Sequence, residues 1–242
     1  MQLFYTPPER ISENRLEIIG EEVVHITKSL RHKVGDTIKV VDGKGTEYTV
    51  IIKEHRRDNL VCEIIEKHSG LINNKRELTL FQAIPKQGKM DFVIEKATEL
   101  GVKRIVPIIT KYSVCVPGNE ENKLRHWNNI AVSAMKQSMG VIVPKIAGLI
   151  NFNVAVEEIK DFELSIIAHN DSNSRYIKDI LPDCRQASKD VRTSSLFIGP
   201  EGGFSEEEVK LAIEKGAIPA SFGVKRLRSE TAAIAGCVLL LI

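Results

Sequence analysis

The feature that most constrains the fold of this chain is an alternation of strand-like and helix-like segments that starts at Leu78. Short apolar runs with the length of buried strands alternate with longer segments of helical periodicity. Strands that alternate with helices form a mostly parallel sheet that helices cover on both faces. The sequence therefore predicts an α/β domain over residues 78–242. Its predicted strands begin at Leu78, Arg104, Leu164, Ser195 and Ile218.

Four helices of this domain are predicted from their ends and faces, one of them along Leu124–Ser138. One is expected over about Gly88–Leu100, because its apolar residues fall on one face and a glycine follows it. Another should begin after Ser205, which forms a capping box with Glu208 three positions on. The last segment, 231–242, is apolar on nearly every side, so it must be buried in the core or against a second subunit.

The N-terminal part, residues 1–70, has a different pattern. Short β-branched runs are separated by turn signals such as Asp42-Gly43. Strands of this length and spacing predict a small barrel, interrupted by one helix near Glu21–Leu30. The polar, weakly patterned stretch 71–77 is the predicted linker to the α/β domain.

The composition excludes several classes of protein. No apolar run approaches the roughly eighteen residues of a transmembrane helix, and the N-terminus lacks the pattern of a signal peptide. The four cysteines form no CxxC pair, so neither a metal site nor a disulfide framework is expected, which fits a reducing cytoplasm. The net charge is +2, but basic residues cluster at His25–Lys39 and Lys75–Lys111, where phosphates could bind. Alternatively, these are solvated faces balanced by acids elsewhere.

A glycine-rich segment, Ile198–Gly203, is the strongest local signal. It follows a predicted buried strand and precedes the capped helix, so it lies at the edge of the sheet where ligands of α/β proteins gather. Its glycines let backbone N–H groups approach a ligand closely. The segment has neither the Gly-Lys-Ser/Thr of a P-loop nor a GxGxxG pattern, which disfavours a nucleotide site. The alternative is a plain tight turn.

A second segment, Gly223–Ala232, also runs from a predicted strand into a helix. It carries three basic residues and Glu230 beside apolar neighbours. By itself it could be a solvated loop that caps the helix. Two such loops at neighbouring strand ends would face one crevice, however, and this coincidence favours a ligand site.

Together these motifs resemble those of the RsmE family of the SPOUT superfamily. The resemblance rests on IGPEGGFSEEE and GVKRLRSETA, with QAIPKQGKMDFVIEKATELGVKRIVPI upstream. The N-terminal LRHKVGDTIKVVDGKG is similar to the PUA-like RNA-binding barrel of that family. The resemblance covers nearly the whole chain. It implies an enzyme that uses S-adenosylmethionine to methylate N3 of uridine 1498 in 16S ribosomal RNA.

The resemblance also implies a fold that the sequence pattern could not indicate, a trefoil knot through which the C-terminal segment passes. S-adenosylmethionine would bind in this knot between the loops 168–170, 198–203 and 222–232, and two copies of the chain would form a homodimer. The residues expected to bind the cofactor are Ala168, His169, Ile198, Gly199, Pro200, Glu201, Gly202, Gly203, Phe222, Gly223, Leu227, Ser229, Thr231 and Ala232.

The implied reaction needs particular side chains. Uracil N3 carries a hydrogen and is a weak nucleophile until that proton leaves. The site should therefore offer a base, and a cation for the negative charge that spreads onto O2 and O4. We assign Arg228 to charge stabilisation or target positioning, and Glu201 or Glu230 to proton acceptance. Either glutamate could instead anchor the start of a helix.

The RNA contacts are harder to assign. Basic residues of the barrel are candidates for contacts with phosphates of 16S ribosomal RNA, within the small ribosomal subunit. These candidates are Arg10, Lys28, Arg31, His32 and Lys33. Aromatic residues make up 5% of the chain, and the sequence indicates none as a platform for base stacking.

Three positions depart from the family's pattern. Tyr112, Gly140 and Lys225 stand where arginine is usual, and lysine cannot supply the planar fork of arginine. The expected fold and cofactor are unaffected, but the RNA contacts cannot be transferred residue by residue. Two other functions stay open: a SPOUT methyltransferase that acts on another RNA atom, and a non-catalytic RNA-binding assembly factor.

Overall fold

The computed structural model describes residues 2–70, 76–86, 88–114, 118–171, 174–180 and 192–241. Contacts between Cα atoms divide the chain into two units. The first comprises Met1–Asn73 and Val132–Val143, and the second comprises Asn74–Ala131 and Pro144–Ile242. Among the described residues, no helix is long and apolar enough to cross a membrane.

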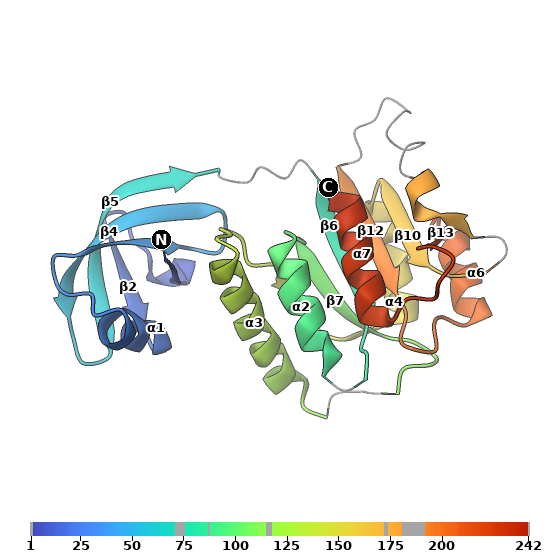
Figure 1. Cartoon of the computed structure of the whole chain (residues 1–242), viewed down its shortest axis with the longest axis horizontal. Helices are drawn as coiled ribbons and strands as arrows, with labels where there is room; N and C mark the ends of the chain where they lie inside the picture. Colours follow the sequence, from blue (N-terminus) through green and yellow to red (C-terminus); the bar gives the residue numbers. More distant parts are fainter. Residues whose placement is uncertain are drawn as a thin grey trace. The chain divides into compact units, whose positions relative to one another are not determined.

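The first unit is built on a five-stranded sheet (Figure 1). The strands in spatial order are β1 (Leu3–Tyr5), β3 (Thr37–Val41), β4 (Thr46–His55), β5 (Asn59–Ser69) and β2 (Arg15–Ile19). Only β1 and β3 pair in parallel; the other described pairs are antiparallel. The hydroxyl of Thr6, just after one edge strand, donates to the carbonyl of Glu17 in the other edge strand at 2.8 Å. The sheet therefore curls towards closure, in agreement with the PUA-like barrel that the sequence predicted.

Successive side chains of these strands point to opposite faces of the sheet, and this alternation explains which residues form the core of the first unit. Ile38 and Val40 of β3, with Val50 and Ile52 of β4, point to the same side and are buried together. The predicted helix near residues 21–30 is present as α1 (Glu21–Val24), which continues into a π-helical turn, His25–Ser29. The short strand β1 and the 3-10 turn Pro8–Arg10 were not predicted.

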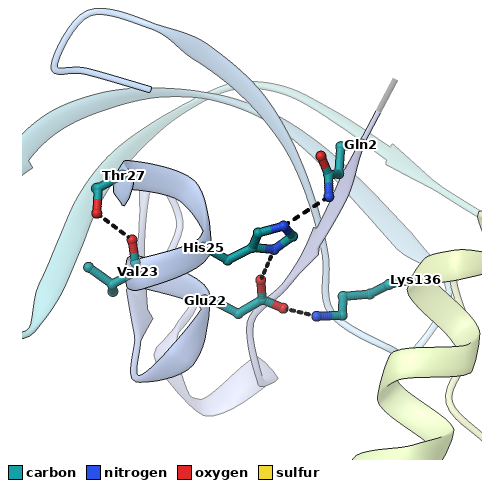
Figure 2. Close-up of polar contacts among 6 residues, drawn as sticks. All are labelled: Gln2, Glu22, Val23, His25, Thr27 and Lys136. Carbon is teal, nitrogen blue, oxygen red and sulfur yellow. Dashed lines mark hydrogen bonds and ion pairs between the residues drawn. The ribbon is translucent and has the colours of Figure 1, made fainter. Parts of the chain in front are cut away.

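The end of helix α3 (Glu120–Gln137) and the residues that follow it belong to the first unit. Figure 2 shows the ion pair between Lys136 and Glu22 that contributes to this. The same carboxylate lies 4.0 Å from Nδ1 of His25, whose Nε2 is 3.1 Å from the Gln2 amide nitrogen. Buried Met135 also packs with Leu3 and Val41. Lys136 and Met135 lie more than ninety positions after their partners Glu22, Leu3 and Val41, so local sequence patterns could not indicate these contacts.

The predicted division of the chain therefore differs from the units that the contacts define. The sequence placed all of residues 78–242 in one domain, whereas Val132–Val143 contacts the first unit. Most of the predicted linker 71–77 lies outside the described residues, and the boundaries 1–70 and 78–242 stay a prediction.

The second unit is built on a parallel sheet, as predicted. Its strands in spatial order are β11 (Arg175–Tyr176), β13 (Ile218–Ser221), β10 (Leu164–Ala168), β12 (Thr193–Ile198), β6 (Glu77–Ala83), β7 (Arg104–Ile109) and β8 (Lys145–Ile146), with β9 (Ile150–Asn151) also paired to β7. All of these pairings are parallel. The short strands β8, β9 and β11 were not predicted.

Helices cover both faces of this sheet. Phe81 of β6 stacks on Phe197 of β12, with ring centroids 4.3 Å apart. Both rings are buried with residues of α4 (Phe152–Ala155), the 3-10 helix Val156–Asp161 and α6 (Glu206–Glu214). The other face carries α2 (Lys89–Glu99) and α7 (Ser229–Leu241), which lie side by side (Figure 1). The predicted capping box of Ser205 and Glu208 is present at the start of α6.

Helix α7 lies very close to the sheet. A Cβ atom at Gly236 would be 2.5 Å from Cδ2 of Leu196 and 3.0 Å from Cε1 of Phe222, so no larger residue fits there without a shift. The chain passes from β12 to β13, beyond β10, and then returns to pack α7 against β12 and β6. This return to the middle of the sheet agrees with the knotted path expected from the resemblance.

Candidate functional site

A cavity of about 510 Å³ lies at the carboxyl ends of three adjacent parallel strands, β13, β10 and β12. Its walls are the loops that follow these strands, together with the first turn of α7. Cavities that bind small molecules have volumes of about 300–1,000 Å³, and ligands of open α/β sheets gather at this edge. The cavity is therefore a candidate ligand site.

The structure brings together nearly all the residues that the sequence singled out. Every residue expected to bind the cofactor lines the cavity except Thr231. Among the expected catalytic residues, Arg228 and Glu201 line the cavity and Glu230 does not. Sequence reasoning missed Phe204, Ala220 and Ser221, which border the expected loops. Phe204 lies within the motif IGPEGGFSEEE, whereas Ala220 and Ser221 carried no motif signal. The cofactor contacts of these residues stay a prediction.

The glycine-rich loop is compact because its chain folds back on itself. The N–H of Gly203 donates to the carbonyl of Pro200 at 2.8 Å, and Gly203 has a φ of +77°, which favours glycine. A Cβ atom at Gly199 would lie 3.0 Å from the carbonyl carbon of Gly203. Glycine at both positions therefore allows the tight turn that exposes backbone groups to the cavity.

Buried hydrogen bonds attach the start of α7 to the sheet. Nε2 of Gln82, at the end of β6, donates to Oγ of Ser229 at 3.0 Å, and this hydroxyl donates to the carbonyl of Gly199 at 2.6 Å. Gln82 is fully buried, so each of these polar groups depends on a protein partner. The bonds connect β6, the glycine-rich loop and α7, which fixes two walls of the cavity relative to each other.

A second connection joins the other two loops. The hydroxyl of Ser221 donates to Oδ1 of Asn170 at 3.0 Å and lies 3.3 Å from the N–H of Gly223. The N–H of His169 donates to the carbonyl of Ala220 at 2.9 Å. The loops after β10 and β13 are thus held against each other before any ligand binds.

The rim of the cavity is basic. Nη2 of Arg226 donates to the carbonyl of Glu201 at 3.3 Å, which joins the basic loop to the glycine-rich loop. Lys225 and Arg228 are exposed, and their charged groups make no hydrogen bond or ion pair with the described residues. Oε1 of Glu201 accepts the N–H of Lys86 at 3.0 Å. The rim therefore has cations available for a negatively charged partner.

Glu230 has a different environment from Glu201. Its Oε1 is 3.0 Å from Nζ of Lys89. Burial of the carboxyl opposes its ionisation, but a hydrogen bond from its own N–H, a hydrogen bond from Lys89 and the charges of Lys89 and Arg228 hold its pKa below the ordinary value. A carboxylate with a lowered pKa is a weak base. This geometry suits an anchor for the start of α7.

The barrel residues expected to contact RNA lie in the first unit. Lys28, Arg31 and Lys33 are exposed on one continuous segment, while Arg10 lies apart in sequence and pairs with Glu17 at 3.6 Å. His32 of the same segment is held by its Nδ1, which is 3.2 Å from Oδ2 of Asp36. Among the described residues, no group of three or more His, Cys, Asp or Glu side chains could hold a metal ion.

The electrostatics of this segment keep Asp36 ionised. The N–H of Lys33 donates to its carboxylate at 2.8 Å, and this bond, followed by that of His32, lowers the pKa of Asp36. The ionised carboxylate thus fixes the segment that presents the basic side chains to solvent.

Comparisons with known proteins agree with this fold. A family model described as an RNA methyltransferase domain matches residues 73–241, and one described as an RNA methyltransferase PUA domain matches residues 18–65. The chain is similar to ribosomal RNA small subunit methyltransferase E of Bacillus subtilis, with 30% identity over 223 residues, 89% of this chain and 85% of that protein. The protein of the same name from Mesomycoplasma hyopneumoniae is 35% identical over 174 residues, 72% of this chain and 73% of that protein.

A solved structure is similar over nearly the whole chain. It is ribosomal RNA small subunit methyltransferase E from Neisseria gonorrhoeae bound to S-adenosyl methionine. The TM-score is 0.84 and the sequence identity is 27%, and the match covers 98% of this chain and 95% of that one.

The hydroxyl of Ser229 gives a test of how the cavity walls are held. Ser229→Ala should lower the free energy of unfolding by about 2 kcal/mol, because it removes the hydroxyl that donates to the Gly199 carbonyl and one of the two acceptors of the buried Gln82 amide. Urea unfolding would measure this change. Thr231→Ala is the matched control on the same helix turn, where the side chain is exposed and a change within about 0.5 kcal/mol is expected. Equal losses for the two variants would contradict the role of Ser229.

Proposed function

This chain belongs to the ribosomal RNA small subunit methyltransferase E family, and we propose that it transfers a methyl group from S-adenosylmethionine to N3 of a uridine in 16S ribosomal RNA. One observation carries the proposal. The residues that the motifs single out come together as the walls of one cavity. The similar Neisseria gonorrhoeae enzyme was solved with S-adenosyl methionine bound, which supports this choice of ligand.

The cavity has the chemical character that this cofactor needs. Apolar side chains, including Ile198, Leu227 and Ala232, can cover the adenine ring, and backbone groups of the glycine-rich loop can hydrogen-bond its polar atoms. S-adenosylmethionine, when bound, supplies an electrophilic methyl group on a sulfonium. The chain must then hold an acceptor base in line with that group and adjust its charge.

We assign these tasks to two residues of the cavity wall. The guanidinium of Arg228 makes no hydrogen bond or ion pair with the described residues and can bind the oxygen of uracil that gains negative charge when N3 loses its proton. Glu201 lines the cavity with one carboxylate oxygen bound to the Lys86 N–H, and it is the candidate proton acceptor. Glu230 then serves as an anchor, because Lys89 pairs with it.

The basic segment of the first unit would contact the phosphates of the RNA. Lys28, Arg31 and Lys33 are exposed there, next to His32, and we include Arg10 with them. Such contacts position the protein without reading sequence. With the small ribosomal subunit as substrate, the protein works in the cytoplasm.

The reaction product tests the proposal directly. The purified protein, incubated with S-adenosylmethionine and small ribosomal subunits that lack this methyl group, should produce N3-methyluridine in 16S ribosomal RNA. Mass spectrometry of the nucleosides would identify it. Methylation of a ribose 2′-hydroxyl or of guanine N1 would assign the chain to another SPOUT activity. Calorimetry that detects no binding of S-adenosylmethionine would instead favour a non-catalytic assembly factor.

Substitution of Arg228 separates chemistry from cofactor binding. Arg228→Ala should lower kcat/KM for methylation by roughly a hundredfold, because a preorganised donor to the developing charge is lost, while the Kd for S-adenosylmethionine changes little. Gly203→Val, which strains a φ of +77°, is the comparison in which cofactor binding itself should be lost. Lys210→Ala, an exposed cation of α6, is the control. Parallel losses of activity and affinity in Arg228→Ala would make Arg228 a cofactor-binding residue instead.

We also propose that two copies of the chain form a homodimer through the face of α2 and α7. After its first three residues helix α7 is apolar on all sides, and Ile234, Val238 and Leu239 are only partly covered by the rest of the unit. On the adjacent helix α2, the side chain of Phe92 is 45% exposed. A second copy would bury this apolar face, as is common in obligate dimers.

Phe92 offers a test with a matched control. Phe92→Glu should convert a dimer to a monomer, because a charge would be buried without a partner in the interface. Ile213→Glu, on α6 of the opposite layer, changes a side chain that is 46% exposed and should leave the dimer intact. Sedimentation equilibrium would measure the molecular mass. A monomeric unmodified protein, or dissociation by both variants, would contradict this interface.

A further inference from the structure

Tyr112 stands on a rigid turn beside the cavity. Strand β7 ends at Ile109, and the next four residues form a turn closed by two hydrogen bonds. The N–H of Thr110 donates to Oγ of Ser113 at 2.9 Å, and the N–H of Ser113 donates to the carbonyl of Thr110 at 3.0 Å. Tyr112 is the third residue of this turn, and its side chain is 47% exposed.

The turn is also fixed to helix α6. The N–H of Lys111 donates to Oε1 of Glu208, the capping-box glutamate, at 2.7 Å. Nζ of Lys111 pairs with Oε2 of Glu207 at 3.1 Å. The backbone that carries the tyrosine therefore has little freedom, and the ring is presented to solvent from a fixed base.

Tyr112 contacts the glycine-rich loop. A Cβ atom at Gly202 would lie 3.1 Å from Cβ and 3.5 Å from Cγ of Tyr112, closer than a methyl group normally packs. Gly202 itself lines the cavity. One side of the tyrosine thus rests on the loop that walls the cavity, while about half of the side chain stays open to solvent.

Cations lie near the ring and along the neighbouring cavity. Nζ of Lys111, which pairs with Glu207, is 6.0 Å from the ring centroid. Lys225, Arg226 and Arg228 line the cavity that Gly202 also lines. An exposed aromatic ring beside a basic groove is the combination that binds unpaired nucleic acid, since cations track the phosphates and rings stack on bases. The core of a protein–protein interface is instead depleted of charged residues.

We infer that the exposed face of Tyr112 stacks on a nucleobase of the RNA as the target uridine enters the cavity. The inference rests on the proposed function and adds to it a recognition contact that the sequence did not indicate. Stacking depends on the aromatic ring and not on charge or on the hydroxyl. It therefore predicts a different pattern of variants from a phosphate contact or from a tyrosine that only supports the loop.

The test measures RNA affinity and cofactor affinity on the same full-length variants. A fluorescein-labelled, single-stranded, uridine-containing RNA is titrated by anisotropy at several salt concentrations, and S-adenosylmethionine is titrated by calorimetry. Tyr112→Leu, which keeps bulk without an aromatic face, should raise the Kd for RNA by about tenfold. Tyr112→Phe should bind like the unmodified protein. The Kd for S-adenosylmethionine should change less than about twofold in both variants, and the slope of log Kd against log salt should be unchanged, because stacking releases no counterions.

Three results would overturn the inference. Unchanged RNA affinity in Tyr112→Leu would show that the ring contacts no base. A parallel loss of cofactor affinity would make Tyr112 a support for the glycine-rich loop, and a loss in Tyr112→Phe would point to the hydroxyl. The proposed function is judged separately by the methylated nucleoside that the unmodified protein makes, so the stacking contact and the reaction can fail independently.

Discussion

The hydrogen bonds of Ser229 connect three segments that are far apart in sequence: the end of β6, the glycine-rich loop after β12 and the start of α7. They lie where water cannot replace them, since Gln82 is fully buried. The position of α7 therefore depends on the position of the loop, and the cavity keeps its shape without a ligand. A preorganised cavity spends little binding energy on ordering its walls.

Close approach of backbones is the second constraint on this site. Gly236 lets α7 come close to Leu196, and Gly203 lets the loop after β12 turn sharply enough to form a wall of the cavity. The short distance to the sheet requires glycine at position 236, and the positive φ favours glycine at position 203. Larger residues would therefore displace α7 or open the cavity. Gly202, in the same loop, has no side chain, and Tyr112 packs against the space that a side chain would fill.

The first unit shows how tertiary contacts can differ from a division drawn along the chain. Lys136 lies more than a hundred residues after Glu22, yet the two side chains form an ion pair in which both are mostly buried. Met135 adds an apolar contact with Val41. A domain boundary predicted from local composition could not take these contacts into account. Composition describes neighbouring residues in the sequence, and it does not indicate which distant segments pack together in the fold.

The sequence by itself determined the features that depend on neighbouring residues. The alternation of strands and helices predicted the parallel sheet, Ser205 and Glu208 predicted the start of α6, and the two motifs predicted most of the cavity lining. Only the tertiary structure separated Glu201, which faces the cavity, from Glu230, which pairs with Lys89. It alone set Tyr112 against the glycine-rich loop. These roles depend on distances between segments remote in sequence, and no local pattern encodes those distances.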